Sequence, residues 1–168
     1  MAALGLDTYQ PLLDRFTDTL EQVYGDRLIS VVLFGSVARG TANPDSDLDL
    51  LVIIDGLPER YGDRLDDILP ILKGLRVDPT YDLLISEGIF PSPSVILFTP
   101  KEANQHRLLY LDMIEDSVRL FDRQGFFENR LEALRIRLKE LGAARTRQNG
   151  DWYWDLKPDL RPGEALVL

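Results

Sequence analysis

The sequence predicts an α/β fold: a small mixed β-sheet with helices packed mainly on one face, followed by a carboxy-terminal helix and tail. Two observations favour this fold. Continuous apolar runs of strand length, at 28–34 and 47–54, indicate buried strands. Around them, apolar residues recur at helical spacing, first over 8–24. Such alternation of strands and helices is typical of α/β domains.

The first half of the chain is expected to contain two helices, a short helical turn and two strands. In order, these are a helix at 8–24, a strand at 28–34, a short helical turn at 37–40, a strand at 47–54 and a helix at 59–75. Gly25 should end the first helix, and Pro70 should kink or split the last one. The second strand is apolar on both faces except at its polar start, which predicts burial on both sides.

The second half is expected to complete the sheet and add the last helices. In order, these are a strand at 80–86, an extended loop at 88–94, an edge strand at 95–98, a helix at 100–116, a strand at 118–121 and a helix at 131–141. Thr99, Pro100 and Glu102 form a capping-box signature. We expect the main domain over 1–124, with 125–168 as a helix and a docked tail containing Trp152-Tyr153-Trp154, all in one compact unit.

Composition limits the partners that the chain can take. With 168 residues and no cysteine, it has room for one domain and cannot use disulfides or thiolate ligands, which suits a reducing cytoplasm. No leader-like or membrane-spanning run is visible. The net charge of −9 disfavours a long nucleic acid as partner. A basic stretch at 130–147 is interpreted first as a solvated helix face, and alternatively as a surface for phosphates or an acidic partner.

The stretch from Gly35 to Asp49 contains the residues most suited to chemistry. Gly35 lets the backbone approach a ligand, and Ser36 adds a hydroxyl beside backbone amides that can face an anion. Asp47 and Asp49 lie two residues apart on a strand, so their carboxylates share one face and suit Mg²⁺. A phosphate site beside a Mg²⁺ site predicts chemistry on a nucleoside triphosphate.

These residues resemble a known signature. Gly35-Ser36, ten residues, and then Asp47-Leu48-Asp49 are similar to the motif of the DNA polymerase beta-like nucleotidyltransferase superfamily. Ala38-Arg39-Gly40 and Ser46 resemble its minimal nucleotidyltransferase branch, and the similarity covers about 12–122. The resemblance implies two Mg²⁺ ions, ATP or another nucleoside triphosphate as donor, a protein hydroxyl as acceptor, and service as antitoxin to a HEPN-domain protein. Self-association is left open.

The resemblance also implies a third carboxylate on a neighbouring strand. Asp82 is the candidate, because it is the only acid within the apolar pattern at 80–86. It would complete the second metal site and take the proton of the acceptor hydroxyl. Asp78 and Asp45 are the competitors, although both are expected in loops or turns. Arg39 is placed near the triphosphate by the resemblance, and an ordinary ion pair is the alternative.

Other chemistries find less support. The spacing from Gly35 to Gly40 imitates a P-loop, but Thr41-Ala42 follows where that motif needs Lys and Ser or Thr. His106, the sole histidine, is expected on the surface. Three functions remain: transfer of a nucleotide to a protein, transfer to a small molecule such as an aminoglycoside, and an inactive module that only binds a nucleotide or partner.

Overall fold

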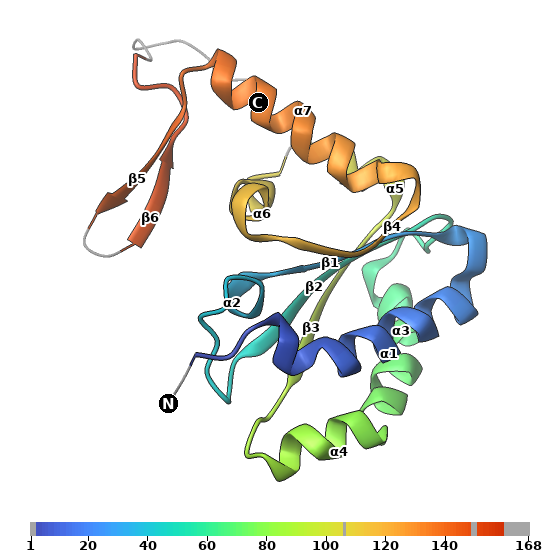
Figure 1. Ribbon diagram of the computed structural model, residues 1–168. Helices are drawn as coiled ribbons and strands as arrows, with labels where there is room; N and C mark the ends of the chain where they lie inside the picture. Colours follow the sequence, from blue (N-terminus) through green and yellow to red (C-terminus); the bar gives the residue numbers. More distant parts are fainter. Residues whose placement is uncertain (1–2, 106, 149–150, 160–168) are drawn as a thin grey trace.

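A four-stranded mixed sheet forms the centre of the computed structural model, which describes residues 3–105, 107–148 and 151–159 (Figure 1). Its strands lie in the order β3-β2-β1-β4. They are β1 (Leu28–Phe34), β2 (Asp47–Ile54), β3 (Ser92–Phe98) and β4 (Val118–Asp122). β1 pairs antiparallel with β2 and β4, whereas β2 pairs parallel with β3. The strands expected at 28–34 and 47–54 are confirmed, and a mixed sheet is confirmed with them.

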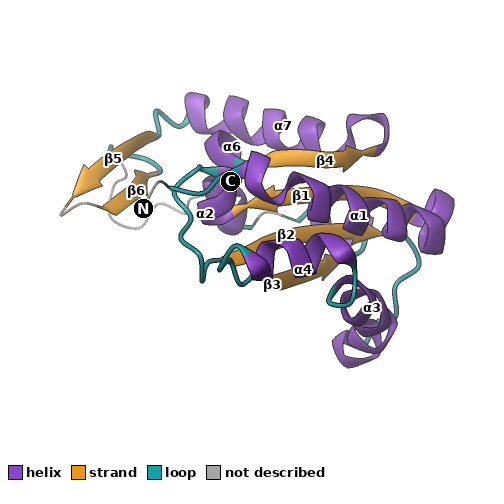
Figure 2. Ribbon diagram, turned by 60° about the horizontal axis from the view of Figure 1, so that its bottom comes forward, coloured by secondary structure: helices purple, strands orange, loops and turns teal. Residues whose placement is uncertain are grey.

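Helices cover both faces of this sheet, not mainly one (Figures 1 and 2). Three helices pack with the even residues of β2 on one face: α1 (Leu6–Tyr24), α3 (Tyr61–Leu75) and α4 (Pro79–Ser86). Three others pack with its odd residues on the second face: α5 (Pro100–Ala103), α6 (Leu109–Asp116) and α7 (Phe126–Glu140). Because strand side chains alternate between the two faces, Leu51 and Ile53 pack into the hydrophobic core on the second face. Asp47 and Asp49 therefore lie on the α6–α7 face.

The strand expected at 80–86 is wrong, because these residues form the helix α4. Asp78 caps the helix, since its side chain accepts a hydrogen bond of 3.0 Å from the Thr80 backbone N–H. Pro79 occupies the first turn, where its missing N–H is not needed. A short apolar run does not distinguish a helix from a strand, and local capping decides it here. The third strand is β3, which begins within the stretch expected to be a loop.

The remaining helices differ in detail from expectation. α3 runs through Pro70 as one helix, and the helix expected at 100–116 is divided into α5 and α6. The capping box of Thr99 and Glu102 is confirmed. His106 lies outside the described residues. Within the part of the chain that the structure describes, no helix is both long and apolar enough to cross a membrane.

The tail continues from α7 as a hairpin of β5 (Ala144–Gln148) and β6 (Asp151–Asp155), which stands out from the body in Figure 1. The Trp154 indole Nε1–H donates to the Leu111 carbonyl at 3.2 Å, and Arg145 pairs with Asp116 at 3.1 Å. Both contacts attach the hairpin to α6. The side chain of Trp152 and residues 160–168 lie outside the described part.

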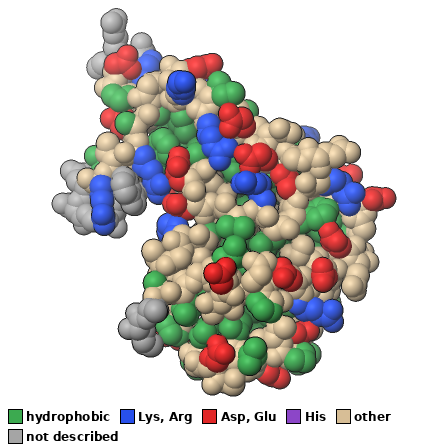
Figure 3. Space-filling model, viewed as in Figure 1, with side chains coloured by type: hydrophobic (Ala, Val, Ile, Leu, Met, Phe, Trp, Pro, Cys, Tyr) green, Lys and Arg blue, Asp and Glu red, His purple; other side chains and the backbone are tan. Residues whose placement is uncertain are grey.

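The basic stretch at 130–147 lies on a surface of mixed charge. Figure 3 shows Lys and Arg side chains over α7 and the hairpin interspersed with Asp and Glu. Ion pairs join Arg135 to Glu128 and Glu132, Arg137 to Glu140, and Arg145 to Asp116. These pairs support the interpretation as a solvated face.

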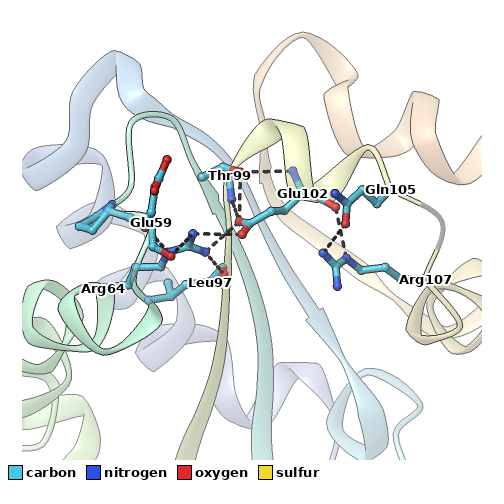
Figure 4. A network of polar contacts seen from close by, with 8 residues as sticks. Glu59, Arg64, Leu97, Thr99, Glu102, Gln105 and Arg107 are labelled. Carbon is cyan, nitrogen blue, oxygen red and sulfur yellow. Dashed lines mark hydrogen bonds and ion pairs between the residues drawn. The ribbon is translucent and has the colours of Figure 1, made fainter.

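A buried arginine ties α3 to the corner between β3 and α5 (Figure 4). Arg64 is only 4% exposed. Its guanidinium donates to both carboxylate oxygens of Glu102, at 2.8 and 3.0 Å, and to the carbonyls of Pro58 and Leu97. A buried charge is stable only when paired and hydrogen-bonded, so Glu102 is the group that makes Arg64 acceptable there.

Replacing Glu102 by glutamine is expected to lower the free energy of unfolding by about 1–3 kcal/mol at neutral pH. The Arg64 hydrogen bonds first, followed by those of Thr99, hold the pKa of Glu102 at about 2 against an ordinary 4.5, although partial burial opposes them. A carboxylate with a lowered pKa contributes stability that is complete above its unfolded pKa and is lost as the pH falls toward its folded pKa. Urea unfolding should therefore show a difference between wild type and variant that shrinks between pH 4.5 and 2.

Glu59→Gln is the matched control, because Arg64 uses only the backbone carbonyl of Glu59. This variant should unfold like the wild type at every pH. A difference for Glu102→Gln that does not change with pH would contradict the assignment.

Candidate active site

The site begins where β1 ends. Gly35 follows Phe34 directly and opens the short helix α2 (Gly35–Ala38) with a φ of +77°, a conformation that side chains rarely adopt. A Cβ at Gly35 would lie 2.1 Å from Oδ2 of Asp49. The residue is therefore glycine for two reasons, its backbone conformation and the carboxylate that lies against it. This contact brings the two halves of the motif together.

The two carboxylates of β2 lie on one face at the mouth of the sheet. Asp47 is exposed and Asp49 is half-buried, and Asp49 stands opposite Phe34 in the β1–β2 register. Burial raises the pKa of Asp49, the charge of Asp47 raises it further, and the Arg39 guanidinium opposes the rise. The pair is thus a site of concentrated negative charge, and a divalent cation would relieve it. The donor set, two carboxylates on one face of a strand, fits Mg²⁺.

Arg39 follows α2 directly and is exposed. Its effect on the pKa of Asp49 shows that its positive charge acts on the carboxylate site. Gly35, Arg39, Asp47 and Asp49 are therefore brought together by the structure, and Ser36 lies beside Gly35 in the same turn of helix.

A turn held by side-chain hydrogen bonds precedes β2 and fixes where the strand begins. The Asn43 N–H donates to Oγ of Ser46 at 2.9 Å, and the Asp45 N–H donates to Oδ1 of Asn43 at 2.9 Å. Backbone hydrogen bonds between Leu4 and Ala42, at 2.9 and 3.1 Å, tie the same turn to the start of the chain. Ser46 and Asn43 thus hold the turn that presents Asp47.

Asp82 does not stand beside this pair. It lies exposed in the first turn of α4, because the strand on which its assignment rested is a helix. Across the described residues, no three His, Cys, Asp or Glu side chains are grouped so that they could hold a metal ion together. Of the competitors, Asp78 caps α4 and pairs with Arg15 at 2.9 Å, and its pKa is lowered chiefly by hydrogen bonds from Thr80.

The strand that does flank the carboxylates is β3, and it presents serines. In the parallel register Ser92 stands beside Asp47 and Ser94 beside Asp49, and both serines are exposed. These neighbours are not evident from the sequence, because Pro91 and Pro93 indicate a loop. A proline is tolerated here because β3 is an edge strand, so not every N–H is needed for pairing.

Comparison with known proteins gives consistent matches. A family model described as nucleotidyltransferase domain matches residues 13–140. A protein of Methanocaldococcus jannaschii that carries the provisional name protein adenylyltransferase MJ1305 is 35% identical over 143 residues, which cover 84% of this chain and 90% of that protein. Protein adenylyltransferase MntA of Thermococcus cleftensis is 37% identical over 90 residues, 53% of this chain and 89% of its own.

Among solved structures, spectinomycin adenyltransferase AAD(9) from Enterococcus faecialis, with ATP and spectinomycin, aligns with a TM-score of 0.50. The identity is 13%, and the alignment covers 79% of this chain and 66% of that one. This similarity shows the fold alone.

Proposed function

The chain belongs to the nucleotidyltransferase domain family and is a nucleotidyltransferase, and we propose that it moves AMP from ATP to a hydroxyl group of a protein. The observation that carries the proposal is the close approach of Gly35 to Asp49, which places the Gly35-Ser36 turn directly against the two carboxylates. The protein acceptor is supported by the 35% identical relative, which is named for adenylyl transfer to protein.

Asp47 and Asp49 are the residues that would hold Mg²⁺. Bound Mg²⁺ would neutralise the triphosphate and stabilise the entering and leaving oxygens of the transfer. Two ions are proposed, as the family resemblance implies. Since the pair offers only two carboxylates, the remaining oxygen ligands would come from the triphosphate and from water.

The residues around the pair would bind the nucleotide. Gly35 lets the backbone approach the phosphates, the Ser36 hydroxyl can donate to a phosphate oxygen, and the Arg39 guanidinium suits the same anion. Arg39 would also screen the carboxylates from each other when no ligand is present, as its effect on the pKa of Asp49 indicates.

For the biological role, we propose that the chain is the antitoxin of a HEPN-domain protein and modifies that partner. This role is supported by the minimal nucleotidyltransferase motif and by the relative named MntA. Transfer to a small molecule is the second candidate, but the similarity to the spectinomycin enzyme extends to the fold alone. An inactive binding module is disfavoured by the intact Gly35–Asp49 site.

The test is transfer of label from ATP labelled at the α-phosphate, in the presence of Mg²⁺ and host lysate. We expect label on one or a few proteins, and stronger label on a co-expressed HEPN-domain partner. Label on a small molecule would favour the second candidate instead. If the folded protein binds Mg²⁺ and ATP but labels nothing, the transfer proposal is wrong.

Replacing Asp82 by asparagine is expected to leave ATP binding and single-turnover transfer within about twofold of wild type, because surface changes away from a site have small effects. Calorimetric titration and transfer to the acceptor from the lysate experiment would measure both. A loss of about a hundredfold in transfer would be the size expected for a general base, and would return Asp82 to the catalytic residues.

A further inference from the structure

One side of α3 carries apolar side chains to the surface. Tyr61, Leu65 and Leu69 are 46%, 39% and 43% exposed. They recur every four residues, so they form one stripe along the helix. The core is filled from another side of α3, by Arg64, Ile68, Ile71 and Leu75. Figure 2 shows α3 at the edge of the molecule, at the far end from the hairpin.

The carboxy-terminal half of the same side is hollowed. A groove of about 300 Å³ lies there. It is lined by Leu69, Leu72 and Lys73 of α3, by Arg76 just after the helix, and by Pro93 of β3. The amino-terminal half instead presents the projecting side chains of Tyr61 and Leu65, with Asp66 on the same side of the helix. One half of the stripe therefore carries exposed apolar side chains beside an acidic residue, and the other half is a groove with a basic rim.

We propose that two copies of this chain pair through α3, with the two helices antiparallel about a two-fold axis near Leu69. Residues four before Leu69 then meet residues four after it. Leu65 of each copy enters the groove of the other, and Asp66 lies beside Lys73. Such an isologous contact requires a surface that complements itself, and α3 does so in both shape and charge. A parallel arrangement would instead place like charges together.

The apolar contacts supply the affinity of this interface, and the charges set its direction. Exposed ion pairs contribute little to stability, whereas like charges brought together oppose association. The surface is separate from Asp47 and Asp49, which lie on the opposite face of the sheet from α3. The pairing therefore does not depend on the proposed function.

Charge reversal tests the direction of pairing. Asp66→Lys and Lys73→Asp are each expected to raise the dimer dissociation constant at least about tenfold, and the double variant should recover most of the loss. Sedimentation equilibrium over a range of protein concentrations measures the constant. Asp63→Lys is the matched control, because Asp63 is exposed on the same helix but on the side away from the stripe. Circular dichroism checks that each variant is folded.

The absence of cysteine from the sequence allows a second, independent test. A single Leu69→Cys substitution lies near the proposed axis. Under mild oxidation the new cysteine should form a disulfide with the same cysteine of the second chain. Ile136→Cys, at a site 54% exposed on α7, should not. A wild-type chain that stays monomeric, with equal cross-linking of the two variants, would overturn the proposal. So would a dimer that is unaffected by either charge reversal.

Discussion

Asp49→Asn is expected to abolish Mg²⁺-dependent ATP binding and to lower transfer by at least about a thousandfold, because metal charge stabilisation contributes several kcal/mol. Asp49 lies against Gly35 and beside Asp47, so its carboxylate is the centre of the candidate metal site. Asparagine has nearly the same shape, and packing should survive. Calorimetric titration with Mg²⁺ and ATP, together with single-turnover transfer, measures the two losses.

The same substitution is expected to raise the melting temperature of the metal-free protein at neutral pH. The pKa of Asp49 is raised above its ordinary 3.8, by burial first and then by the charge of Asp47. The stability linked to such a group is present below its unfolded pKa, where it is protonated, and is lost as the pH rises through its folded pKa. The stabilising effect of Asp49→Asn should therefore appear as the pH rises from acid and vanish below about pH 3.8.

Asp45→Asn is the control, because Asp45 is exposed in the turn just before the pair. It should change neither metal binding nor the melting temperature appreciably. Normal ATP affinity with Mg²⁺ in a folded Asp49→Asn variant would remove Asp49 from the metal site.

The central part of the site was predictable because its signals are local. The strands at 28–34 and 47–54 are continuous apolar runs between polar turns, and such runs have few alternatives. Glycine, serine and aspartates at fixed spacing then place the chemistry at the strand ends. The sequence of β2 also indicates the second helical layer, because a strand that is apolar on both faces must be covered on both.

The third strand was not predictable in the same way. The apolar residues at 81–85 fit a strand or a helix equally well, and the cap provided by Asp78 decides for the helix. Pro93 indicates a loop until the topology shows that its strand lies at an edge. Asp82 was expected at the site because the residues around it could form a strand. Ser92 and Ser94 were not expected there because Pro93 indicated a loop.

Gly35→Ala is expected to lower kcat/KM for ATP by at least about a hundredfold, because small displacements in an active site have effects of that size. The new Cβ would sit 2.1 Å from Oδ2 of Asp49, so the carboxylate must rotate away from its position beside Asp47. Nucleotide binding should weaken at the same time, since the methyl group occupies the space beside the carboxylates. Steady-state kinetics and titration with ATP and Mg²⁺ measure both.

Gly40→Ala separates this contact from backbone strain. Gly40 has a φ of +68°, close to the +77° of Gly35, but a Cβ there meets no atom within 4 Å. Both variants should lose stability to a similar extent, since alanine is unfavourable at positive φ. Only Gly35→Ala should lose ATP binding and transfer. If the two variants lose activity equally, strain in the turn explains the effect and the approach of Gly35 to Asp49 has no special role. If Gly35→Ala folds and transfers normally, the turn is only a connection between β1 and β2.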